Sequence, residues 1–314
     1  MIRFTKQNDF PSLHKTVARE LLLTTPVDRC SWQSGVAPSA VHELEDAILQ
    51  FDVPALATKW AATIYPDLPS DNLGWAEAHF QERVSGQPLN PAPSYLDWPW
   101  HSEKYREQFK ARRVMDGPVC CTGDCCGPGS YCCARANPHS HDKDGNWVPE
   151  AVVARPFDHT YPERMWPKLA GGTPEFPAPM SGIRFDYGDL QDVIDLLKRD
   201  PFTRQAYLPI WFPEDTGSVE GQRVPCTLGY HFIRYGAQLN VKYFIRSCDI
   251  TRHLPNDVYM AGRLLQHVVL HLEGTGKPSL GREYAAPYAG DLTMFISNLH
   301  MFTADKWRYE GITR

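Results

Sequence analysis

Nine cysteines supply the most reactive side chains of this sequence, and they occur in two contrasting settings. Six of them crowd into one short segment, as Cys120, Cys121, Cys125, Cys126, Cys132 and Cys133. Cys226 instead follows Pro225 at the head of a segment of strand-like composition, ahead of Arg246 and Asp249. Crowded thiolates are typical metal ligands, whereas a thiolate beside charged groups is a nucleophile. A buried cysteine packing as a small apolar residue is the alternative for Cys226.

The crowded cysteines are followed by His139 and His141, whose imidazoles could complete a tetrahedral zinc site. The cysteines come as adjacent pairs and lack the usual spacing of zinc knuckles. A structural zinc is therefore one of three interpretations, beside reduced thiols in a loop and disulfides formed on oxidation. No secretory signal is present, so the disulfide interpretation is the weaker one for the reduced interior of a cell.

Two other patterns do not carry the chemistry that they resemble. Residues 274–277 read Gly-Thr-Gly-Lys, but the earlier glycine that a phosphate-binding loop requires is replaced by His271. His267 and His271 lie one helical turn apart, yet apolar residues separate them and no glutamate is present between them. A structural helix explains this pair better than a metal site does.

The composition is that of an ordinary globular protein. The chain has 314 residues, 42% of them hydrophobic, and a net charge of −5, which gives no overall attraction to nucleic acid. No apolar run approaches membrane-spanning length, so we expect no membrane segment and a cytoplasmic location, which would be the host cytoplasm if the protein is viral.

The elements that must position these residues are clearest in the C-terminal half. Helical spacing predicts helices near 40–51 and 74–85, a third ending at Asp200-Pro201, and a fourth over 258–272. Alternation predicts strands at 204–212, 226–236, 238–249 and 291–299. Residues 87–185 read as long loops. We therefore predict an α/β (α+β) fold in one domain, 1–314, with a Cys/Pro/Gly-rich insertion at about 100–158.

Several segments occur in an order and spacing that resemble the thymidylate synthase superfamily. They are the arginine-containing segment 200–215, the Pro225-Cys226 pair, Arg-Ser-Cys-Asp at 246–249, Leu-Pro-Asn-Asp at 254–257, and Gly-Asp-Leu-Thr-Met-Phe at 290–295. The convincing resemblance covers about 115 residues, 185–300, and the N-terminal half matches loosely. It implies a mixed sheet flanked by helices and a cysteine nucleophile.

The chemistry of such a nucleophile suits Cys226. Carbon 5 of a pyrimidine is a poor nucleophile, but a thiolate that adds at carbon 6 converts it into an enamine-like carbon. That carbon can attack a one-carbon donor, which the resemblance identifies as 5,10-methylenetetrahydrofolate. The register of Cys226 with Arg246 and Asp249 favours the nucleophile over a packing cysteine.

The resemblance also implies a site for the nucleotide phosphate. Arg246 and Ser247 are its local ligands, Arg204 matches an arginine that reaches across from a second subunit, and Arg29 matches an N-terminal phosphate arginine. Arginine suits phosphate oxygens through its forked donors. Gln205 stands where the family often has a further arginine, so phosphate contact is weaker than usual or is compensated elsewhere. The trans arginine predicts a homodimer.

Two acid–base groups follow from the same resemblance, in addition to Asp249. Tyr161 matches a tyrosine implicated in proton removal from carbon 5, with Pro162 in place of the usual glycine. A family glutamate orders water near the base. We assign it to Glu82, with Glu77 as the second choice, and an exposed helical glutamate is the alternative for each.

One substitution indicates which base is recognised. The family position that reads uracil is normally asparagine, and here it is Asp257. A protonated aspartate, or an aspartate that faces protonated N3, suits cytosine, and burial favours the neutral carboxyl. The same exchange marks the deoxycytidylate hydroxymethylase branch. A helix-capping aspartate is the alternative.

Two further departures affect the sugar and the final nucleophile. Thr293 and Phe295 replace a histidine and a tyrosine that hold the sugar 3′-hydroxyl, so ribose and deoxyribose stay open. The sequence ends 14 residues after His300, before the segment that closes over folate in synthases. Without that lid, water would complete the reaction and yield a hydroxymethyl product, unless upstream loops form another lid.

We therefore predict a C5 hydroxymethyltransferase that acts on dCMP or CMP. The alternatives are an atypical thymidylate synthase, a cytosine-nucleotide methylase, and a non-catalytic nucleotide- or metal-binding homologue. Its predicted partners are a pyrimidine nucleoside monophosphate, folate and a second copy of the chain, with no nucleic acid. Phage DNA modification and nucleoside antibiotic synthesis are both compatible pathways.

Overall fold

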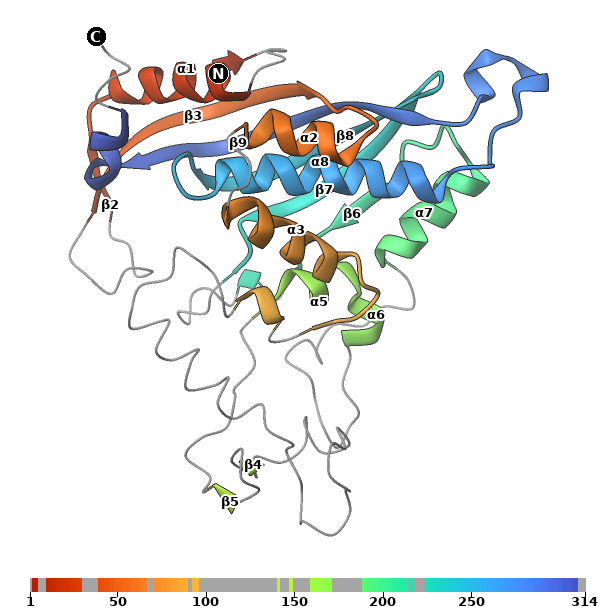
Figure 1. Cartoon of the computed structure of the whole chain (residues 1–314), viewed down its shortest axis with the longest axis horizontal. Helices are drawn as coiled ribbons and strands as arrows, with labels where there is room; N and C mark the ends of the chain where they lie inside the picture. Colours follow the sequence, from red (N-terminus) through yellow and green to blue (C-terminus); the bar gives the residue numbers. More distant parts are fainter. Residues whose placement is uncertain are drawn as a thin grey trace.

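The protein is built around one mixed β-sheet with helices packed on one of its faces (Figure 1). The computed structural model describes residues 2–4, 10–29, 39–66, 71–89, 92–95, 140–141, 147–148, 159–170, 188–213, 215–216 and 224–309. The seven-stranded sheet comprises β1 (Ile2–Phe4), β2 (Val27–Arg29), β3 (Ser39–Asp52), β6 (Tyr207–Pro209), β7 (Thr227–Tyr235), β8 (Gln238–Asp249) and β9 (Tyr288–Phe302). The predicted fold class is confirmed.

The order of the strands places the last strand of the sheet at its centre. The order is β1-β3-β9-β8-β7-β6, with β2 paired to one end of β3. β9 runs antiparallel to β3 and parallel to β8, whereas β7 is antiparallel to both β8 and β6. The parallel pair β8 and β9 is connected through helix α8 (Leu254–His271), as a parallel connection requires.

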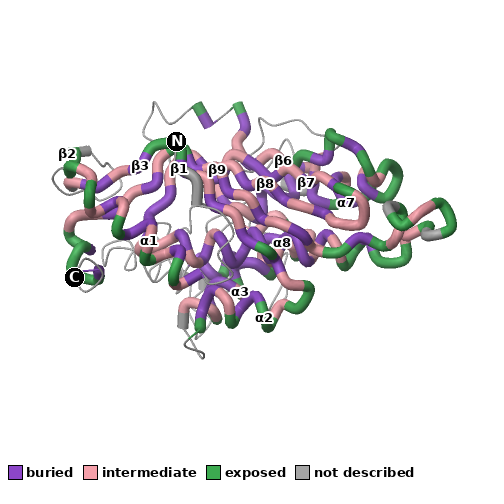
Figure 2. The backbone as a smooth tube through the Cα atoms, turned by 90° about the horizontal axis from the view of Figure 1, so that it is seen from above, coloured by how far each residue is buried: buried purple, intermediate pink, exposed green. Residues whose placement is uncertain are grey.

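The helices cover one face of the sheet (Figure 2). They include α2 (Ala57–Ile64) and α3 (Asp71–Arg83), which both pack against α8, and α1 (Phe10–Leu22), which packs against α2, β3 and β9. Trp60 of α2 packs against Gly262 of α8, where a Cβ would overlap the indole, and its Nε1–H donates to the Tyr259 carbonyl at 2.9 Å. Only glycine permits this close contact between the two helices.

Three short helices lie at the border of the sheet. α5 (Tyr161–Met165) and α6 (Pro167–Ala170) adjoin α3, and α7 (Leu190–Arg199) packs beside β6 with its predicted apolar stripe buried. A separate two-stranded ladder joins β4 (Ser140–His141) to β5 (Trp147–Val148), and 3₁₀ turns occupy Pro93–Tyr95, Pro278–Leu280, Arg282–Tyr284 and Thr303–Tyr309.

The predicted helix at 40–51 is wrong, because this segment is strand β3. The buried positions change parity along the strand, from His42 and Leu44 to Ala47, Leu49 and Phe51. The change occurs at Asp46, whose φ of 53° interrupts the extended backbone. Leu44 and Ala47 therefore face the same side at a spacing of three residues, which imitates a helix.

The same change of parity occurs in the neighbouring strands. In β9 the buried residues switch after Ile296, and in β8 they switch after Ile245, while β7 has an irregular register between Thr227 and Gly229. Asp46 in β3, Ser297 in β9 and Arg246 in β8 lie side by side across the three strands, so the irregular positions form one line across the sheet. This line passes beside Cys226, so the kinked sheet positions the predicted site.

Candidate active site

Cys226 lies immediately before β7, partly exposed and packed against the edge of the core. Its carbonyl accepts a hydrogen bond from the Arg246 N–H at 2.9 Å, which joins the start of β7 to the kinked part of β8. This hydrogen bond and the pairing of the next residue, Thr227, with Ile245 keep the thiol in a defined place. The structure therefore presents Cys226 as a partly accessible thiol on a rigid element.

The Arg246 side chain lies beside the same segment. Its Nε donates to the Pro225 carbonyl at 3.0 Å and Nη2 donates to the Val224 carbonyl at 3.3 Å. These bonds use two of the five N–H donors of the guanidinium and leave the remainder for an anion. The Ser247 hydroxyl lies 3.4 Å from Nδ1 of His300 on β9. The structure brings Arg246 to Cys226, and the phosphate roles of Arg246 and Ser247 stay predictions.

Tyr161 begins helix α5 and faces the residue that follows the thiol. The Thr227 hydroxyl donates to the Tyr161 hydroxyl at 3.3 Å and lies 2.9 Å from the Tyr243 hydroxyl. Pro162 occupies the first turn of α5, where helices accept proline readily, so it does not disturb the backbone there. Burial and then Cys226 raise the pKa of Tyr161, whereas Arg83 lowers it.

Asp257 lies in the first turn of α8, where its carboxylate accepts the Cys248 thiol at 3.6 Å. Burial raises the pKa of Asp257 to about 6, although Arg83 and the bond from Cys248 oppose the rise. Burial also raises the pKa of Cys248 well above its ordinary range, with Asp257 adding to the effect. Cys248 therefore acts as a neutral hydrogen-bond donor, and Asp257 has both protonation states within reach near neutral pH.

The two candidate glutamates of α3 are both engaged elsewhere. Glu82 accepts the Ser94 N–H at 2.6 Å with Oε1 and the Ser94 hydroxyl with Oε2. Glu77 forms a forked pair with Arg263, at 3.0 and 3.1 Å, and accepts the Tyr259 hydroxyl at 2.7 Å. Burial opposes ionisation of Glu77, but these bonds lower its pKa to about 2. A role in ordering water stays a prediction for Glu82.

Asp249 holds the turn that follows β8. Its Oδ1 accepts the N–H groups of Thr251 at 2.8 Å and of Arg252 at 3.2 Å, and its Oδ2 lies 3.6 Å from Nε of Arg252. Burial raises the pKa of Asp249 to about 6 against these bonds. The geometry supports a structural contribution at the turn that leads into α8, and a catalytic role for Asp249 stays a prediction.

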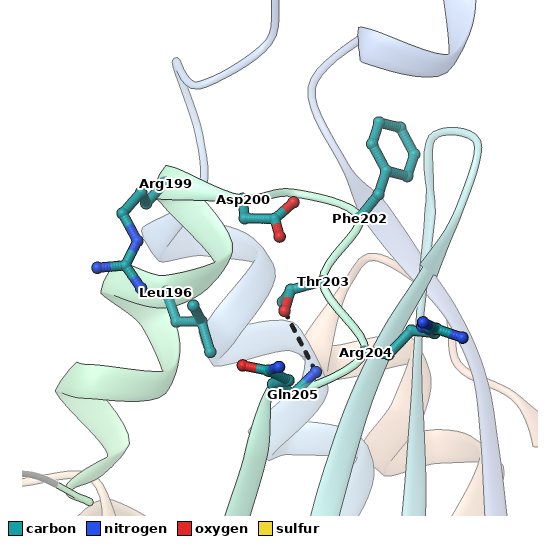
Figure 3. A pocket seen from close by; sticks show the side chains of 7 residues that line it. All are labelled: Leu196, Arg199, Asp200, Phe202, Thr203, Arg204 and Gln205. Atoms are coloured by element: carbon teal, nitrogen blue, oxygen red, sulfur yellow. Dashed lines mark hydrogen bonds between the residues drawn. The ribbon is translucent and has the colours of Figure 1, made fainter.

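Arg204 lies in the exposed segment between α7 and β6. It lines an open hollow of about 610 Å³ with Arg199, Asp200, Thr203 and Gln205 (Figure 3). The two arginines point away from each other across this hollow. An exposed arginine that faces outward is available to a second subunit. The Arg29 backbone pairs with Ser39, and its side chain lies outside the described residues.

Thr293 and Phe295 alternate along β9 with the buried residues Leu292, Met294 and Ile296, so their side chains face the opposite side of the sheet. Phe295 stacks on Phe244, with ring centroids 5.1 Å apart, beside a hollow of about 330 Å³ that Thr293 also lines. Tyr243 and Asp257 lie on the other, helix-covered side. The structure therefore does not bring these two strand positions together with Asp257.

Sequence reasoning overlooked a set of buried polar side chains around Tyr161. Arg83 is only 3% exposed, and its guanidinium lies over the Tyr161 ring at 3.9 Å. Its Nη2 donates to Nε2 of His79, at 2.9 Å, one helical turn away. The spacing of His79 and Arg83 within the predicted helix 74–85 was the available signal. Charged residues are rarely buried in this way without a function or a partner.

The predicted zinc site at Cys120, Cys121, Cys125, Cys126, Cys132, Cys133 and His139 lies outside the described residues. His141 belongs to β4 by its backbone alone. Within the described residues, no group of three metal-binding side chains occurs, which leaves that prediction untested. No helix in the described part of the chain is long and apolar enough to cross a membrane.

Comparison with known proteins gives one match. Residues 168–283 match the protein-family model described as thymidylate synthase, and no curated protein matches the chain. The matched segment covers less than half of the chain and contains Arg204, Cys226, Arg246, Ser247, Asp249 and Asp257. It supports folate-dependent transfer of one carbon to C5 of a pyrimidine nucleotide. Arg29, Glu82 and Tyr161 lie upstream of it.

Proposed function

We propose that the protein transfers a one-carbon unit from 5,10-methylenetetrahydrofolate to C5 of dCMP or CMP and releases a 5-hydroxymethyl nucleotide. The observation that carries the proposal is the joint placement of a thiol and a carboxyl of raised pKa. Cys226 lies immediately before β7. Asp257 lies in the first turn of α8, where it accepts a hydrogen bond from the Cys248 thiol. The first supplies the nucleophile, and the second supplies base recognition.

Cys226 would attack C6 of the pyrimidine as its thiolate. The C6–S bond forms, the 5,6 double bond opens, and electron density moves to C5, which then bonds to the one-carbon unit. Arg246 is close enough to the Cys226 segment to stabilise an anion there, since it donates to the two preceding carbonyl groups. After the bond from the one-carbon unit to folate breaks, a water oxygen bonds to that carbon and loses a proton to solvent. The electron pair of the exocyclic double bond returns to form the 5,6 double bond, the C6–S bond breaks, and the thiolate is regenerated.

Asp257 would select cytosine through its neutral form. A protonated carboxyl donates to N3 of cytosine with its hydroxyl and accepts the N4 amino hydrogen with its carbonyl. Uracil presents the reverse pattern and would leave both groups mismatched. The pKa of about 6 makes this neutral form readily available in a partly buried pocket. Asp257 also supports the hydroxymethyl outcome, because the same exchange marks the hydroxymethylase branch that the segment resembles.

We also propose a homodimer that forms through the uncovered face of the sheet. That face carries an aromatic cluster in which Phe244 contacts Phe295 and Tyr207, at centroid distances of 5.1 and 6.3 Å. An exposed apolar surface of this kind is typical of an interaction site. Arg204 would then reach the phosphate of the neighbouring subunit.

Mixing two inactive variants tests this arrangement. Cys226→Ser and Arg204→Ala subunits should regain activity when mixed, because one hybrid site then has both intact residues. A monomer by sedimentation, or no recovery after verified subunit exchange, would contradict the dimer.

Product mass tests the proposed reaction. The purified protein is incubated with methylenetetrahydrofolate and with CMP, dCMP or dUMP in separate reactions, and the nucleotides are weighed. A cytidine product carrying a hydroxymethyl group is expected. A methyl product lacks one oxygen and would indicate a methylase, a methylated uridine product would indicate a thymidylate synthase, and no product from any nucleotide would indicate a non-catalytic homologue.

A further inference from the structure

Arg83 is a buried cation whose guanidinium, among the described residues, hydrogen-bonds to a neutral group, the imidazole of His79. Burial lowers the pKa of His79 well below its usual range, and Arg83 lowers it further, so the imidazole is uncharged. No carboxylate lies within ion-pair distance of Arg83 in the part of the chain that the structure describes, and its Nε has no hydrogen-bond partner there. A buried charge held in this way is costly and calls for a function.

The position of Arg83 is set by a directed chain of hydrogen bonds. Because Arg83 donates to Nε2 of His79, the imidazole proton is assigned to Nδ1, which lies 2.7 Å from the Ser94 hydroxyl oxygen. That hydroxyl in turn donates to Glu82. The Glu82 carboxylate at the end of this series of hydrogen bonds thus polarises the Ser94 hydroxyl, the His79 imidazole and the Arg83 guanidinium in one direction. These hydrogen bonds fix the position of Arg83 without placing an anion in contact with its guanidinium.

The guanidinium directs its field at Tyr161. Its central carbon lies 3.9 Å from the centre of the ring, and the Tyr161 N–H donates to the Tyr95 hydroxyl at 3.0 Å, which holds the backbone of the helix start. A cation over an aromatic face stabilises the ring, and it stabilises the phenolate far more. The Tyr161 hydroxyl is already joined to Thr227, the neighbour of Cys226.

We infer that Arg83 is a positioning residue that favours the phenolate of Tyr161 and so promotes proton removal from C5. The inference rests on the proposed C5 transfer. In that step the C5–H bond breaks and the proton bonds to the Tyr161 oxygen. The electron pair of the C5–H bond forms a double bond to the one-carbon unit. The bond from that carbon to the folate nitrogen breaks, and the nitrogen keeps the pair and takes a proton from water.

Several ionisable groups surround Tyr161 and form its electrostatic environment. They are His79 and Arg83 from α3, Tyr95 from its 3₁₀ turn, His159 beside α5, Cys226 before β7, Tyr243 from β8 and Asp257 from α8. Cys226 and Asp257 raise the pKa of Tyr161 when they are ionised, and Arg83 is the group that lowers it electrostatically. Removing Arg83 therefore removes the electrostatic interaction that favours the phenolate, while burial still opposes it.

A titration tests the coupling without requiring activity. The full chain is prepared with 3,5-difluorotyrosine at position 161, whose acidic phenol ionises in an accessible range, and fluorine NMR follows its titration. Arg83→Met should move the midpoint upward by about one pH unit or more, and Arg83→Lys should move it less. Arg263→Met is the matched control. Arg263 also stacks on a ring, Phe80 at 4.7 Å, but its charge is paired with Glu77. An unchanged midpoint in Arg83→Met would overturn the inference.

Turnover then tests the catalytic consequence. Arg83→Met should lower kcat about tenfold or more with little change in KM, and deuterium at C5 should slow the variant more than the wild type. Arg83→Lys should recover part of the loss. A raised KM with unchanged kcat and isotope effect would show that Arg83 binds nucleotide instead. If the wild type converts no nucleotide, the proposed function fails, while the titration still decides whether Arg83 acts on Tyr161.

Discussion

Two buried arginines in this protein have opposite surroundings. Arg164 and Arg83 are each about 3% exposed, but Arg164 forms a forked pair with Asp215 at 2.7 and 3.0 Å, whereas Arg83 contacts a neutral imidazole and an aromatic ring. A charge that is neutralised in place holds a structure together. A buried cation that no carboxylate contacts is instead able to stabilise negative charge on a neighbouring group. We refer to Arg164 and Asp215 as the scaffold pair and to Cys226, Thr227, Tyr161, Arg83 and Asp257 as the site cluster.

The largest effect should come from the thiol of the site cluster. Cys226→Ser should lower turnover by at least about a thousandfold, because a hydroxyl at ordinary pKa cannot replace a thiolate nucleophile. The fold should be retained, since Cys226 is partly exposed. Steady-state kinetics measure the turnover, and circular dichroism measures whether the fold is retained. Cys248→Ala is the control and should keep clearly more activity than Cys226→Ser, and equal losses would contradict the assigned nucleophile.

The scaffold pair should respond in stability instead of chemistry. Arg164→Met should lower the free energy of unfolding by about 3–5 kcal/mol, because it leaves the Asp215 carboxylate buried without its partner. Arg83→Met should cost clearly less, since no contacting carboxylate loses its partner. Urea titrations of both variants decide the matter. Equal losses would remove the distinction between the two arginines.

Base selection should change with a single atom replacement in the site cluster. Asp257→Asn should shift preference from cytosine toward uracil nucleotides by about tenfold or more, because a mismatched donor and acceptor pair costs about 1–3 kcal/mol. Competition kinetics with dCMP and dUMP measure the ratio. An unchanged ratio would place Asp257 outside base recognition.

The smallest predicted effect is on the pH dependence of stability, to which Asp257 and Glu77 should contribute in opposite directions. The pKa of Asp257 is raised from 3.8 to about 6 by burial, so its stabilising contribution is complete below pH 3.8 and is lost as pH rises through 6. Glu77 behaves oppositely. Its pKa is lowered from 4.5 to about 2 by hydrogen bonds that outweigh burial, so its contribution is present above pH 4.5 and is lost as pH falls through 2.

Unfolding measurements at about pH 3, 4, 5.5 and 7 test this contrast. Relative to Asp257→Asn, the wild type should lose about 1–2 kcal/mol between pH 4 and pH 7, after allowance for solvent screening. Glu77→Gln should cost stability at pH 7 and progressively less as the solution becomes more acidic than pH 4. Asp249, whose pKa burial also raises to about 6, should leave a residual slope in both proteins. Parallel profiles would refute the assigned directions.

The sequence predicted those parts of the fold whose pattern is regular over a whole element. β7, β8, α7 and α8 were found because alternation or helical spacing continues over most of each of them, and the irregular positions of β7 and β8 lie near an end of the strand. β3 was missed because the kink at Asp46 shifts its apolar residues by one position. Motif spacing placed Cys226 and Arg246 together, as the structure has them.

The buried part of the site could not be predicted in the same way. Arg83 and His79 belong to α3, far along the chain from Tyr161, and a histidine and an arginine one turn apart are ordinary on an exposed helix. Their burial depends on α5 and on the turn Pro93–Tyr95, which come from the loop-rich segment. Motifs reveal groups that are close in the chain, whereas this cluster is assembled from separated segments.

The central place of β9 has a consequence for biosynthesis. β3 and β8 are made first but do not pair with each other, because β9 lies between them and is the last strand of the sheet to leave the ribosome. Until then, the growing chain carries β3 and β8 with strand edges that have no permanent neighbour, and such edges readily pair with other chains. The protein is therefore most prone to aggregation during its own synthesis, and chaperone binding to the nascent chain should protect it until β9 emerges.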